Sequence, residues 1–587
     1  MKVLNLYLKK RKFNFEQTNL AMFIKKSMLF VYVLLASFCS LAQSESTKYT
    51  QQKKIICYKA AIVSANPIAS ETGLKILKKG GNAFDAAIAT QLALAVVYPG
   101  AGNIGGGGFM VAHVKNGKNI TLDYREKAPA KAGRDMYLDN NGNPILKLSE
   151  EGHLSSGVPG TVAGLFATLR YAKLPFTKLI QPAIELAENG FAITMAQAKD
   201  FNDTRAEFVR LNTSLPAFVK NSLWKEGDVL IQKELANTLK RIRDNGLKGF
   251  YEGETARFII EEMQKGNGII SYEDLKTYKA VERDAIEFDY KGAHIISMPL
   301  PSSGGILLQQ MMKMIEQKNI AALGFLSPQA IQLMVEVERR AFADRAEFLG
   351  DNDFVKVPVK KLVSDAYLEE RMKDYDPSKA GNSDITKAGF IKESEETTHL
   401  SIIDDEGNAV SVTTTLNDSY GSKTVVAGAG FILNNEMDDF SIKPGVPNMY
   451  GAIGNDKNAI SPGKRMLSSM TPTIVLKNNK PIIVVGSPGG TTIPTSVFQS
   501  LVDILEFNLS AEDAVNKPKF HHQWLPDSVY VEHSFPQKTI RSLEAMGYKI
   551  KVRESIGRTE LIMINYKPKK QISAIADHRG DDAAAGY

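Results

Sequence analysis

A threonine that follows a highly charged segment is the best candidate for a nucleophile in this chain. Residues 392–396 read Lys-Glu-Ser-Glu-Glu, and Thr397-Thr398-His399 comes directly after them. A threonine side chain has no base of its own, but cleavage of the peptide bond before Thr397 would create a free α-amino group. That amine, with an ordinary pKa of about 7.7–8.0, could take the proton from the hydroxyl group. The pattern therefore indicates a nucleophile released by cleavage, although on spacing alone an ordinary edge strand is the more frequent explanation.

Three polar clusters in the last third of the chain could serve such a nucleophile. Asn434–Asp439 holds three acids and two amides that could surround an ammonium group. Ser468-Ser469 could donate hydrogen bonds to a carboxylate. Gly486–Gly490 contains adjacent glycines, whose two backbone N–H groups could face one oxygen, as an oxyanion hole requires. Each cluster alone is also compatible with an ordinary polar turn or loop.

Several standard sites are absent from the sequence. It has no G-x-S-x-G segment, which disfavours the serine nucleophile of an α/β-hydrolase. It has no H-E-x-x-H and no paired C-x-x-C, and it contains only eight histidines, which disfavours a zinc site. We therefore predict neither a metal ion nor a cofactor.

The elements that must position these residues can be read from local patterns. Leu400–Ile403 alternates in polarity, Asp404–Asn408 has turn composition, and Ala409–Thr415 is rich in β-branched residues, so a β-hairpin follows Thr397. Ala69–Lys79 and Ala83–Val97 have helical patterns, and the second is apolar almost all round, which indicates a buried helix.

Further hairpins and helices complete the pattern. Asn116-Gly117 and Asn478-Asn479 are turn signals between strand-like segments, and Ser327-Pro328 begins a helix that runs to about Phe348. The glycine run 105–108 lacks the lysine and the spacing of a phosphate loop, so close backbone packing is the better interpretation. Residues 376–396 have the composition of a surface linker that ends at Thr397. Antiparallel hairpins between helical blocks favour an α+β fold, with sheets covered by helices.

The first 42 residues have the pattern of a signal peptide. Lys25-Lys26 precedes an apolar core, Met28–Phe38, and Ser40-Leu41-Ala42 has the form of a cleavage site. The core is short for a membrane span, and an uncleaved N-terminal anchor is the alternative. Removal of residues 1–42 takes away seven basic residues and one acid and lowers the net charge from +7 to +1. Nothing in the remaining composition therefore argues for a nucleic-acid partner. Only Cys57 would then remain, which excludes an intrachain disulfide. We expect an exported protein, periplasmic or secreted, without a stable membrane span.

An ordered series of motifs resembles the γ-glutamyltranspeptidase family of N-terminal nucleophile hydrolases. The resemblance covers about Ala61 to Tyr587. Its motifs, in chain order, are Gly80-Gly81-Asn82-Ala83 with Asp85-Ala86-Ala87, Asn103–Phe109, Asp123–Glu126, Gly157–Thr161, Thr397–His399, Asn434–Phe440, Ser468–Met470, Gly486–Gly490 and Ala585–Tyr587.

The resemblance implies a fold and a division of the chain. It implies a four-layer αββα sandwich that cleaves itself between Glu396 and Thr397. The large subunit would span residues 43–396 and the small subunit residues 397–587, with both contributing to one core. Residues 1–42 would be the signal peptide.

The resemblance also implies a role for each site residue. Thr397 would be the self-cleaving residue and nucleophile, oriented by Thr415, and Gly489 and Gly490 would bind the oxyanion. The substrate's carboxylate would be bound by Arg125, Ser468 and Ser469, and its ammonium group by Asn417, Glu436 and Asp439. Tyr450 would cover the pocket, within a lid at residues 444–455. Thr398 receives no role, and His399 is expected to be a buried histidine satisfied by the backbone.

The activity implied by the resemblance is γ-glutamyl transfer and hydrolysis. Glutathione and other γ-glutamyl compounds would be the donors, and water, amino acids or peptides would be the acceptors. An acylase of the same fold that acts on a glutaryl side chain is the nearest alternative, although a glutaryl group has no ammonium for Asp439 to bind. A non-catalytic binding protein that keeps the fold without cleavage is the second alternative.

Overall fold

The hairpin predicted after Thr397 lies at the centre of a seven-stranded sheet. The computed structural model describes residues 52–383 and 397–587. In it, β10 (Thr398–Ile403) pairs antiparallel with β11 (Ala409–Thr415) on one side and with β2 (Ala61–Ser64) on the other. β10 is therefore an interior strand, not the edge strand that its pattern alone allowed.

Two seven-stranded sheets form the middle of the fold. The first has the order β19-β2-β10-β11-β3-β4-β7, and the second has the order β1-β18-β17-β13-β12-β9-β8. The further strands of the first sheet are β3 (Gly107–His113), β4 (Asn119–Asp123), β7 (Val281–Arg283) and β19 (Ala583–Gly586). The strands of the second are β1 (Lys54–Cys57), β8 (Ile286–Tyr290), β9 (Ala293–Ser297), β12 (Thr473–Lys477), β13 (Lys480–Gly486), β17 (Glu560–Asn565) and β18 (Gln571–Ile575).

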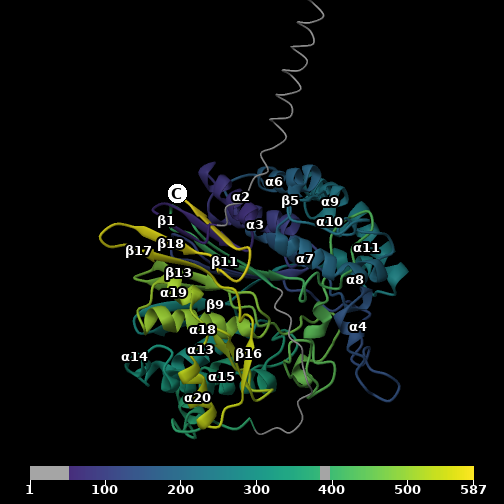
Figure 1. The fold of residues 1–587 in the computed structure, drawn as a ribbon. Coiled ribbons are helices and arrows are strands. Elements are labelled where there is room, and N and C mark those ends of the chain that lie inside the picture. The colour runs from purple at the N-terminus through teal and green to yellow at the C-terminus, as the bar shows by residue number, and fades with distance from the viewer. Residues whose placement is uncertain (1–51, 384–396) are drawn as a thin grey trace, which may run out of the picture. The chain divides into compact units, whose positions relative to one another are not determined.

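Helices cover the outer face of each sheet, as Figure 1 shows. The apolar cluster on the helical side of the first sheet includes residues of α2 (Pro67–Lys78), α3 (Ala83–Val97), α5 (Thr161–Leu169), α6 (Phe176–Asn189), α7 (Met195–Asp203), α8 (Arg205–Leu211), α9 (Lys233–Asn245), α10 (Lys248–Tyr251), α11 (Gly253–Gly266) and α12 (Tyr272–Thr277). The cluster on the helical side of the second sheet includes residues of α13 (Gly304–Glu316), α14 (Ile320–Leu323), α15 (Pro328–Phe348), α16 (Val359–Leu362), α17 (Asp365–Arg371), α18 (Thr492–Leu505), α19 (Ala511–Asn516) and α20 (Gln537–Ala545).

Short elements connect these layers. They are α4 (Lys147–Glu150), three 3-10 turns (His153–Ser155, Glu436–Asp439 and Asp456–Asn458), the ribbon β5 (Phe191–Ala192) with β6 (Val229–Leu230), and a small sheet of β14 (Phe520–His521), β15 (Val529–Glu532) and β16 (Ile550–Arg553).

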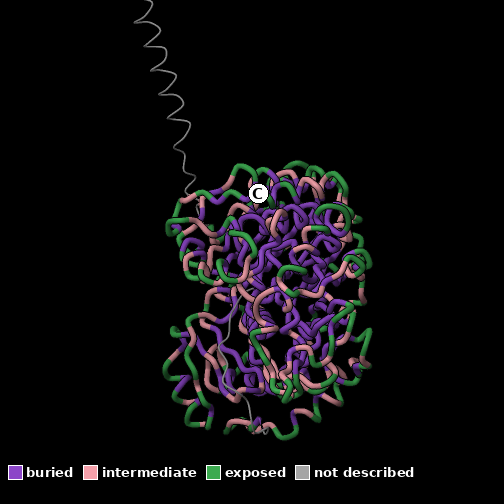
Figure 2. The backbone as a smooth tube through the Cα atoms, turned by 90° about the vertical axis from the view of Figure 1, so that its right-hand side faces the viewer, coloured by how far each residue is buried: buried purple, intermediate pink, exposed green. Residues whose placement is uncertain are grey.

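Three apolar layers separate the sheets and helices, and the hairpin contributes to two of them. Leu400 and Ile402 of β10 face the helices, whereas Ile403 faces the second sheet, because side chains alternate along a strand. Buried residues accordingly run through the body of the protein in Figure 2. The predicted αββα sandwich is confirmed by this architecture.

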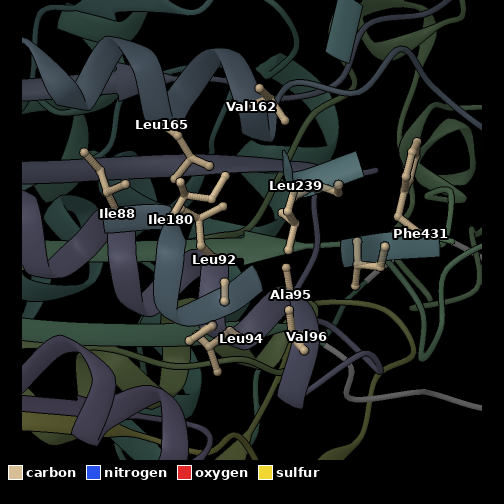
Figure 3. Packing of buried hydrophobic residues seen from close by; sticks show 14 of the residues in the cluster. Ile88, Leu92, Leu94, Ala95, Val96, Val162, Leu165, Ile180, Leu239 and Phe431 are labelled. Carbon is tan, nitrogen blue, oxygen red and sulfur yellow. The ribbon is translucent and has the colours of Figure 1, made fainter. Parts of the chain in front are cut away.

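Helix α3 shows how local sequence signals build the first apolar layer. Asn82 and Asp85 form a reciprocal capping box at its start. Every residue from Ala83 to Val97 is buried. In Figure 3, Ile88, Leu92 and other apolar side chains of α3 pack with residues of neighbouring helices. This layer supports the sheet that contains the two strands of the hairpin.

Both sheets contain strands from before and from after Thr397. In the first sheet, β10, β11 and β19 come after Thr397, while β2, β3, β4 and β7 come before it. In the second sheet, β1, β8 and β9 come before Thr397. The two parts of the chain therefore complete each other's sheets, and neither has a core of its own.

His399 lies in a polar layer between the two sheets, two residues from Thr397. Its Nδ1 lies 2.8 Å from Thr413 Oγ1, and its Nε2 lies 3.1 Å from Ser401 Oγ. The expectation that the backbone satisfies this ring was therefore wrong, because hydroxyl groups on both strands do so. Burial lowers the pKa of His399 to about 3, so the ring is neutral at pH 7. A Cβ atom at Gly486 would lie 2.2 Å from the ring, so this contact between the sheets requires glycine there.

Two predicted segments lie outside the described residues. These are the signal peptide at residues 1–42 and the last part of the linker, residues 384–396. Within residues 52–383 and 397–587, no helix is long and apolar enough to cross a membrane. The same residues contain no group of three or more His, Cys, Asp or Glu side chains that could hold a metal ion.

Candidate active site

One pocket at the end of the central hairpin gathers the predicted site residues. It has an empty volume of about 330 Å³. All the predicted residues except Gly489 line it, namely Thr397, Thr415, Gly490, Arg125, Asn417, Glu436, Asp439, Tyr450, Ser468 and Ser469. Residues that are far apart in the sequence thus meet around one threonine.

The register of the hairpin sets the position of the threonine pair. Thr398 pairs with Thr414, and continuing this register places Thr397 opposite Thr415. Thr415 Oγ1 accepts a hydrogen bond of 2.8 Å from the backbone N–H of Asn417. Asn417 has a positive φ of 80°, so the chain turns sharply there and brings its side chain into the pocket.

The glycine run 105–108 packs closely against the backbone of the hairpin, as predicted. A Cβ atom at Gly106 would lie 2.1 Å from the carbonyl oxygen of Thr415. Asn103 donates from Nδ2 to the same oxygen over 2.8 Å and accepts from Thr161 Oγ1 over 2.7 Å. The run therefore fixes the backbone of Thr415, and Asn103 is a support that the sequence interpretation missed.

Gly489 and Gly490 lie where β13 gives way to α18. Both have positive φ, 130° and 53°, which side chains other than glycine rarely allow. Within the described parts of the chain, neither backbone N–H donates a hydrogen bond to a protein group. Two such donors beside Thr397 could stabilise an oxyanion.

Arg125 forms a buried ion-pair cluster on the opposite side of the pocket. It contacts Glu436 through Nη1 and Asp439 through Nη2, and Glu126 lies 3.8 Å from Nη1. Tyr278 donates from its hydroxyl to the carbonyl oxygen of Arg125 over 2.6 Å and so fixes its backbone. A zwitterionic group could meet both signs of charge here.

The carboxyl groups of this cluster differ in their proton affinity. Burial, with Glu126 and Asp439 close by, raises the pKa of Glu436 well above its ordinary value despite Arg125. Burial also raises the pKa of Glu126 to about 7. The pKa of Asp439 is raised as well, again chiefly by burial, but less strongly than that of Glu436. The larger upward shift favours the neutral form of Glu436 over the neutral form of Asp439.

The segment 444–455, which was predicted to be a lid, lines the pocket through Asn448, Tyr450 and Ala452. The hydroxyl of Tyr450 donates to the carbonyl oxygen of Asn417, and its ring lies over Gly490, where a Cβ atom would come within 2.6 Å of it. Asn448 of the same segment donates from Nδ2 to Asp439 Oδ1 over 2.9 Å. The lid is thereby tied to the residue expected to bind the substrate's ammonium group.

Several pocket residues were not identified from the sequence. Arg345, Asn448 and Thr491 line the pocket without having been named individually. Asn448 lies within the predicted lid and Thr491 directly follows Gly490, whereas Arg345 lies far from every predicted cluster in the sequence.

By contrast, Lys464 and Arg465, adjacent to a predicted cluster, are buried away from the pocket. The Nε atom of Arg465 lies 3.2 Å from Asp123. Adjacency in the sequence to the Ser468-Ser469 cluster therefore does not bring Lys464 and Arg465 into the pocket.

Comparison with known proteins decides the family. The family model described as Gamma-glutamyltranspeptidase matches residues 69–587. The chain belongs to the γ-glutamyltranspeptidase family. The glutathione hydrolase proenzyme of Escherichia coli (strain K12) is 47% identical over 90% of this chain and 91% of that protein. The proenzyme of Bacillus subtilis (strain 168) is 37% identical over 94% and 95%.

Solved structures of γ-glutamyltranspeptidases and acylases share the fold. The cephalosporin acylase of Bacillus halodurans matches with a TM-score of 0.79 and 25% identity over 93% of this chain and 99% of that chain. The γ-glutamyltranspeptidase of Helicobacter pylori matches with a TM-score of 0.54 and 47% identity over 56% and 94%. The resemblance predicted from the motifs is confirmed, and the chain has the sandwich fold of this family.

Replacing Glu436 by Gln tests the protonation of the cluster. If Glu436 is already neutral, the substitution removes no charge, and we expect kcat/KM for a γ-glutamyl anilide to stay within about threefold of wild type. Asp439→Asn, the matched control, removes a charged partner and should lower kcat/KM by about 10- to 100-fold. Steady-state kinetics at pH 7.5 gives both values, and equal losses in the two variants would contradict the assignment.

Proposed function

We propose that this protein is a self-processing γ-glutamyltransferase and glutathione hydrolase. Its family membership supports this activity, and the pocket around Thr397 supports it chemically. Support comes from the lining of the pocket, in which Thr397, Gly490 and the ion pair of Arg125 with Asp439 surround one small volume. A γ-glutamyl group needs all of these, because its α-carboxylate and α-ammonium lie close to the reacting amide.

Cleavage before Thr397 would supply the missing base. The new α-amino group of Thr397, with an ordinary pKa of about 7.7–8.0, can accept the proton of its own Oγ. The position of Thr397 at the start of the hairpin supports this step, since it leaves the amine beside the hydroxyl and beside Thr415. Thr415 would orient the nucleophile.

The reaction then proceeds by acyl transfer. Thr397 Oγ attacks the γ-carbonyl carbon, and the N–H groups of Gly489 and Gly490 stabilise the oxyanion, by about 3 kcal/mol each. The tetrahedral intermediate collapses, the C–N bond breaks, and the amine departs with the proton held by the α-amino group. Water then gives hydrolysis, whereas a second amine gives transfer, and either returns the proton to the base.

Binding of the donor would use the charges of the pocket. Arg125, Ser468 and Ser469 would bind the α-carboxylate. The ammonium would be bound by Asn417, Glu436 and Asp439, and Tyr450 would cover the pocket. The burial of this cluster supports the proposal, because electrostatic interactions strengthen as water is excluded.

The organisation of the precursor is part of the proposal. Residues 43–396 would form the large subunit and residues 397–587 the small subunit. The shared sheets support their association after cleavage, because each segment contributes strands to both. Residues 1–42 would direct export to the periplasm or the medium, supported by their basic and apolar pattern.

A glutaryl acylase of the same fold is the second candidate. An acylase proenzyme, Acylase ACY 1 of Pseudomonas sp. (strain V22), is 34% identical over 89% of this chain and 92% of that protein. A glutaryl group carries the carboxylate but no ammonium. The acidic side of the pocket, with Asp439 and Glu436 around Arg125, therefore favours the γ-glutamyl donor.

Thr397→Ala should yield one uncut chain without activity. A single hydroxyl serves both the self-cleavage and the acyl transfer, so its loss stops both. Denaturing electrophoresis and an anilide assay on the purified variant measure the two effects. Thr398→Ala is the matched control, because Thr398 lies one position along the strand and has no role in the mechanism, and it should process and turn over as wild type does. Two normal subunits from Thr397→Ala would refute the assignment.

Donor preference separates the two candidate activities. The wild-type enzyme should hydrolyse γ-glutamyl anilide with a kcat/KM at least about 10-fold higher than that for glutaryl anilide, because the glutaryl group leaves Asp439 without its charged partner. Both rates can be followed by release of the same aniline. A preference for the glutaryl compound would establish the acylase instead.

A further inference from the structure

A second pocket lies on the helical side of the second sheet and is separate from the one around Thr397. Its lining comes from α15, from the last part of α18, from β14 and from the loops next to these elements. Its empty volume is about 280 Å³, close to the 330 Å³ of the candidate active site. Among the described residues, the two pockets have no lining residue in common.

The walls of this pocket are apolar and partly aromatic. Ala330, Ile331, Met334 and Phe520 are buried and form its inner part. The lining residues that are half-buried, and so mark its opening, are Phe325, Leu326, Phe507 and Pro518. The rings of Phe325 and Phe507 meet edge to face, with their centroids 5.7 Å apart.

Asp503 is the one charged side chain among the described residues that line this pocket. It is only 7% exposed. Within residues 52–383 and 397–587, its carboxyl group accepts no hydrogen bond from a protein group and has no cationic nitrogen within 4 Å. Gln499, the other polar lining residue, spends its amide on the backbone of Phe520, donating over 2.6 Å and accepting over 3.2 Å. The pocket thus holds a buried carboxyl group without a partner.

The surroundings of Asp503 disfavour its negative charge. It lies in the last turn of α18, where the helix dipole presents its negative end. Burial raises the pKa of Asp503 to about 7; Lys519 opposes this shift and Asp513 adds to it. Lys519 itself donates to Ser500 Oγ over 3.3 Å and to the carbonyl oxygen of Ala514 over 2.9 Å. This lysine is therefore engaged elsewhere, and an incoming cation would remove the cost of a lone buried carboxylate.

The chemistry of the pocket fits an organic ammonium ion. A protonated amine can pair with the carboxylate, and its apolar body can lie against the phenylalanine rings, whose faces attract cations. An amino acid fits poorly, because its own carboxylate would meet Asp503 and no described lining residue is positively charged. A metal ion fits poorly as well, since one carboxyl group and one occupied amide supply too few oxygen ligands.

We propose that this pocket binds a small primary amine that lacks a carboxylate group, with its ammonium group on Asp503 and its apolar body against Phe325, Phe507 and Phe520. The inference does not depend on the γ-glutamyl activity. The site lies at the opposite end of α18 from Thr491 and Ile493, which line the candidate active site. Its ligand class also differs, because the pocket around Thr397 presents both signs of charge.

Isothermal titration calorimetry with benzylamine tests the site. The wild-type protein should bind this amine with a Kd on the order of 1 mM, because the ligand is small. Asp503→Asn keeps the shape of the side chain and removes its charge, so the Kd should rise by about 10-fold. Benzyl alcohol has nearly the same shape without the charge and should bind to the wild-type protein about 10-fold more weakly than benzylamine.

Two matched controls separate this site from other acids. Asp439→Asn removes a carboxylate from the pocket around Thr397 and should leave the affinity for benzylamine unchanged. Asp513→Asn removes an acid that acts on Asp503 without lining its pocket, and it should change the Kd by less than about twofold. The thermal midpoint of each variant reports whether it is folded.

The affinity should also rise with pH in the wild-type protein. A primary amine stays protonated between pH 6 and pH 8, whereas Asp503, with a pKa of about 7, becomes mostly ionised over that range. The Kd for benzylamine should therefore fall by about 10-fold from pH 6 to pH 8. This measurement needs no variant, so the proposal stays testable if Asp503→Asn does not fold.

Three results would overturn the proposal. An equal Kd for the wild-type protein and a folded Asp503→Asn variant would exclude Asp503 as the partner. A loss of affinity in Asp439→Asn alone would place the amine in the pocket around Thr397. The absence of saturable binding to the wild-type protein at pH 8 would show that the pocket takes no amine, whatever the outcome of the γ-glutamyl assays.

Discussion

The nucleophile of this enzyme must satisfy two opposed demands. In the proposed mechanism Thr397 is a chain terminus whose own amine is the base, and it must also lie within a core where the surrounding dipoles are fixed. The fold resolves this by placing Thr397 at the start of an interior strand, with β2 and β11 on its two sides. If cleavage occurs before Thr397 as proposed, the sheets would form around an uncut chain before the amine is released. Strands from both sides of the cut then hold the two pieces together.

The charged side of the pocket depends on the same burial. Arg125, Glu436 and Asp439 lie in a low-dielectric environment in which an unpaired charge is costly and a paired one is held firmly. Burial limits that cost by raising the pKa of Glu436, which favours its neutral form. Among the described residues, the hydrogen-bond partners of Arg345 are the hydroxyl groups of Ser303 and Ser469. The pocket thus holds complementary charges for a zwitterion before the donor arrives, and little reorganisation is needed on binding.

Local sequence patterns predicted the elements, and family motifs predicted most of the pocket. The hairpin after Thr397, the buried helix α3 and the close packing of the glycine run follow from alternation, capping signals and the absence of side chains. Arg345 could not be found in this way, because its helix shows only a periodic pattern and its contact in the pocket is with a serine loop more than a hundred residues away. The hydrogen-bond partners of His399, on the same strand and on the neighbouring one, were also not predicted. The side chains of Lys464 and Arg465 are buried, although the sequence around them is polar. Side-chain contacts decide these positions, within the hairpin for His399 and between distant segments for the others, and the local sequence pattern does not reveal them.

The central claim is that Thr397, freed at its amine, carries the acyl group. Peptide mass spectrometry of enzyme quenched by acid during turnover of a γ-glutamyl donor tests it most directly. The account predicts a fragment whose first residue is Thr397 and in which Thr397 carries one γ-glutamyl group. A γ-glutamyl group on another residue, or a small subunit that begins at a different residue, would contradict it.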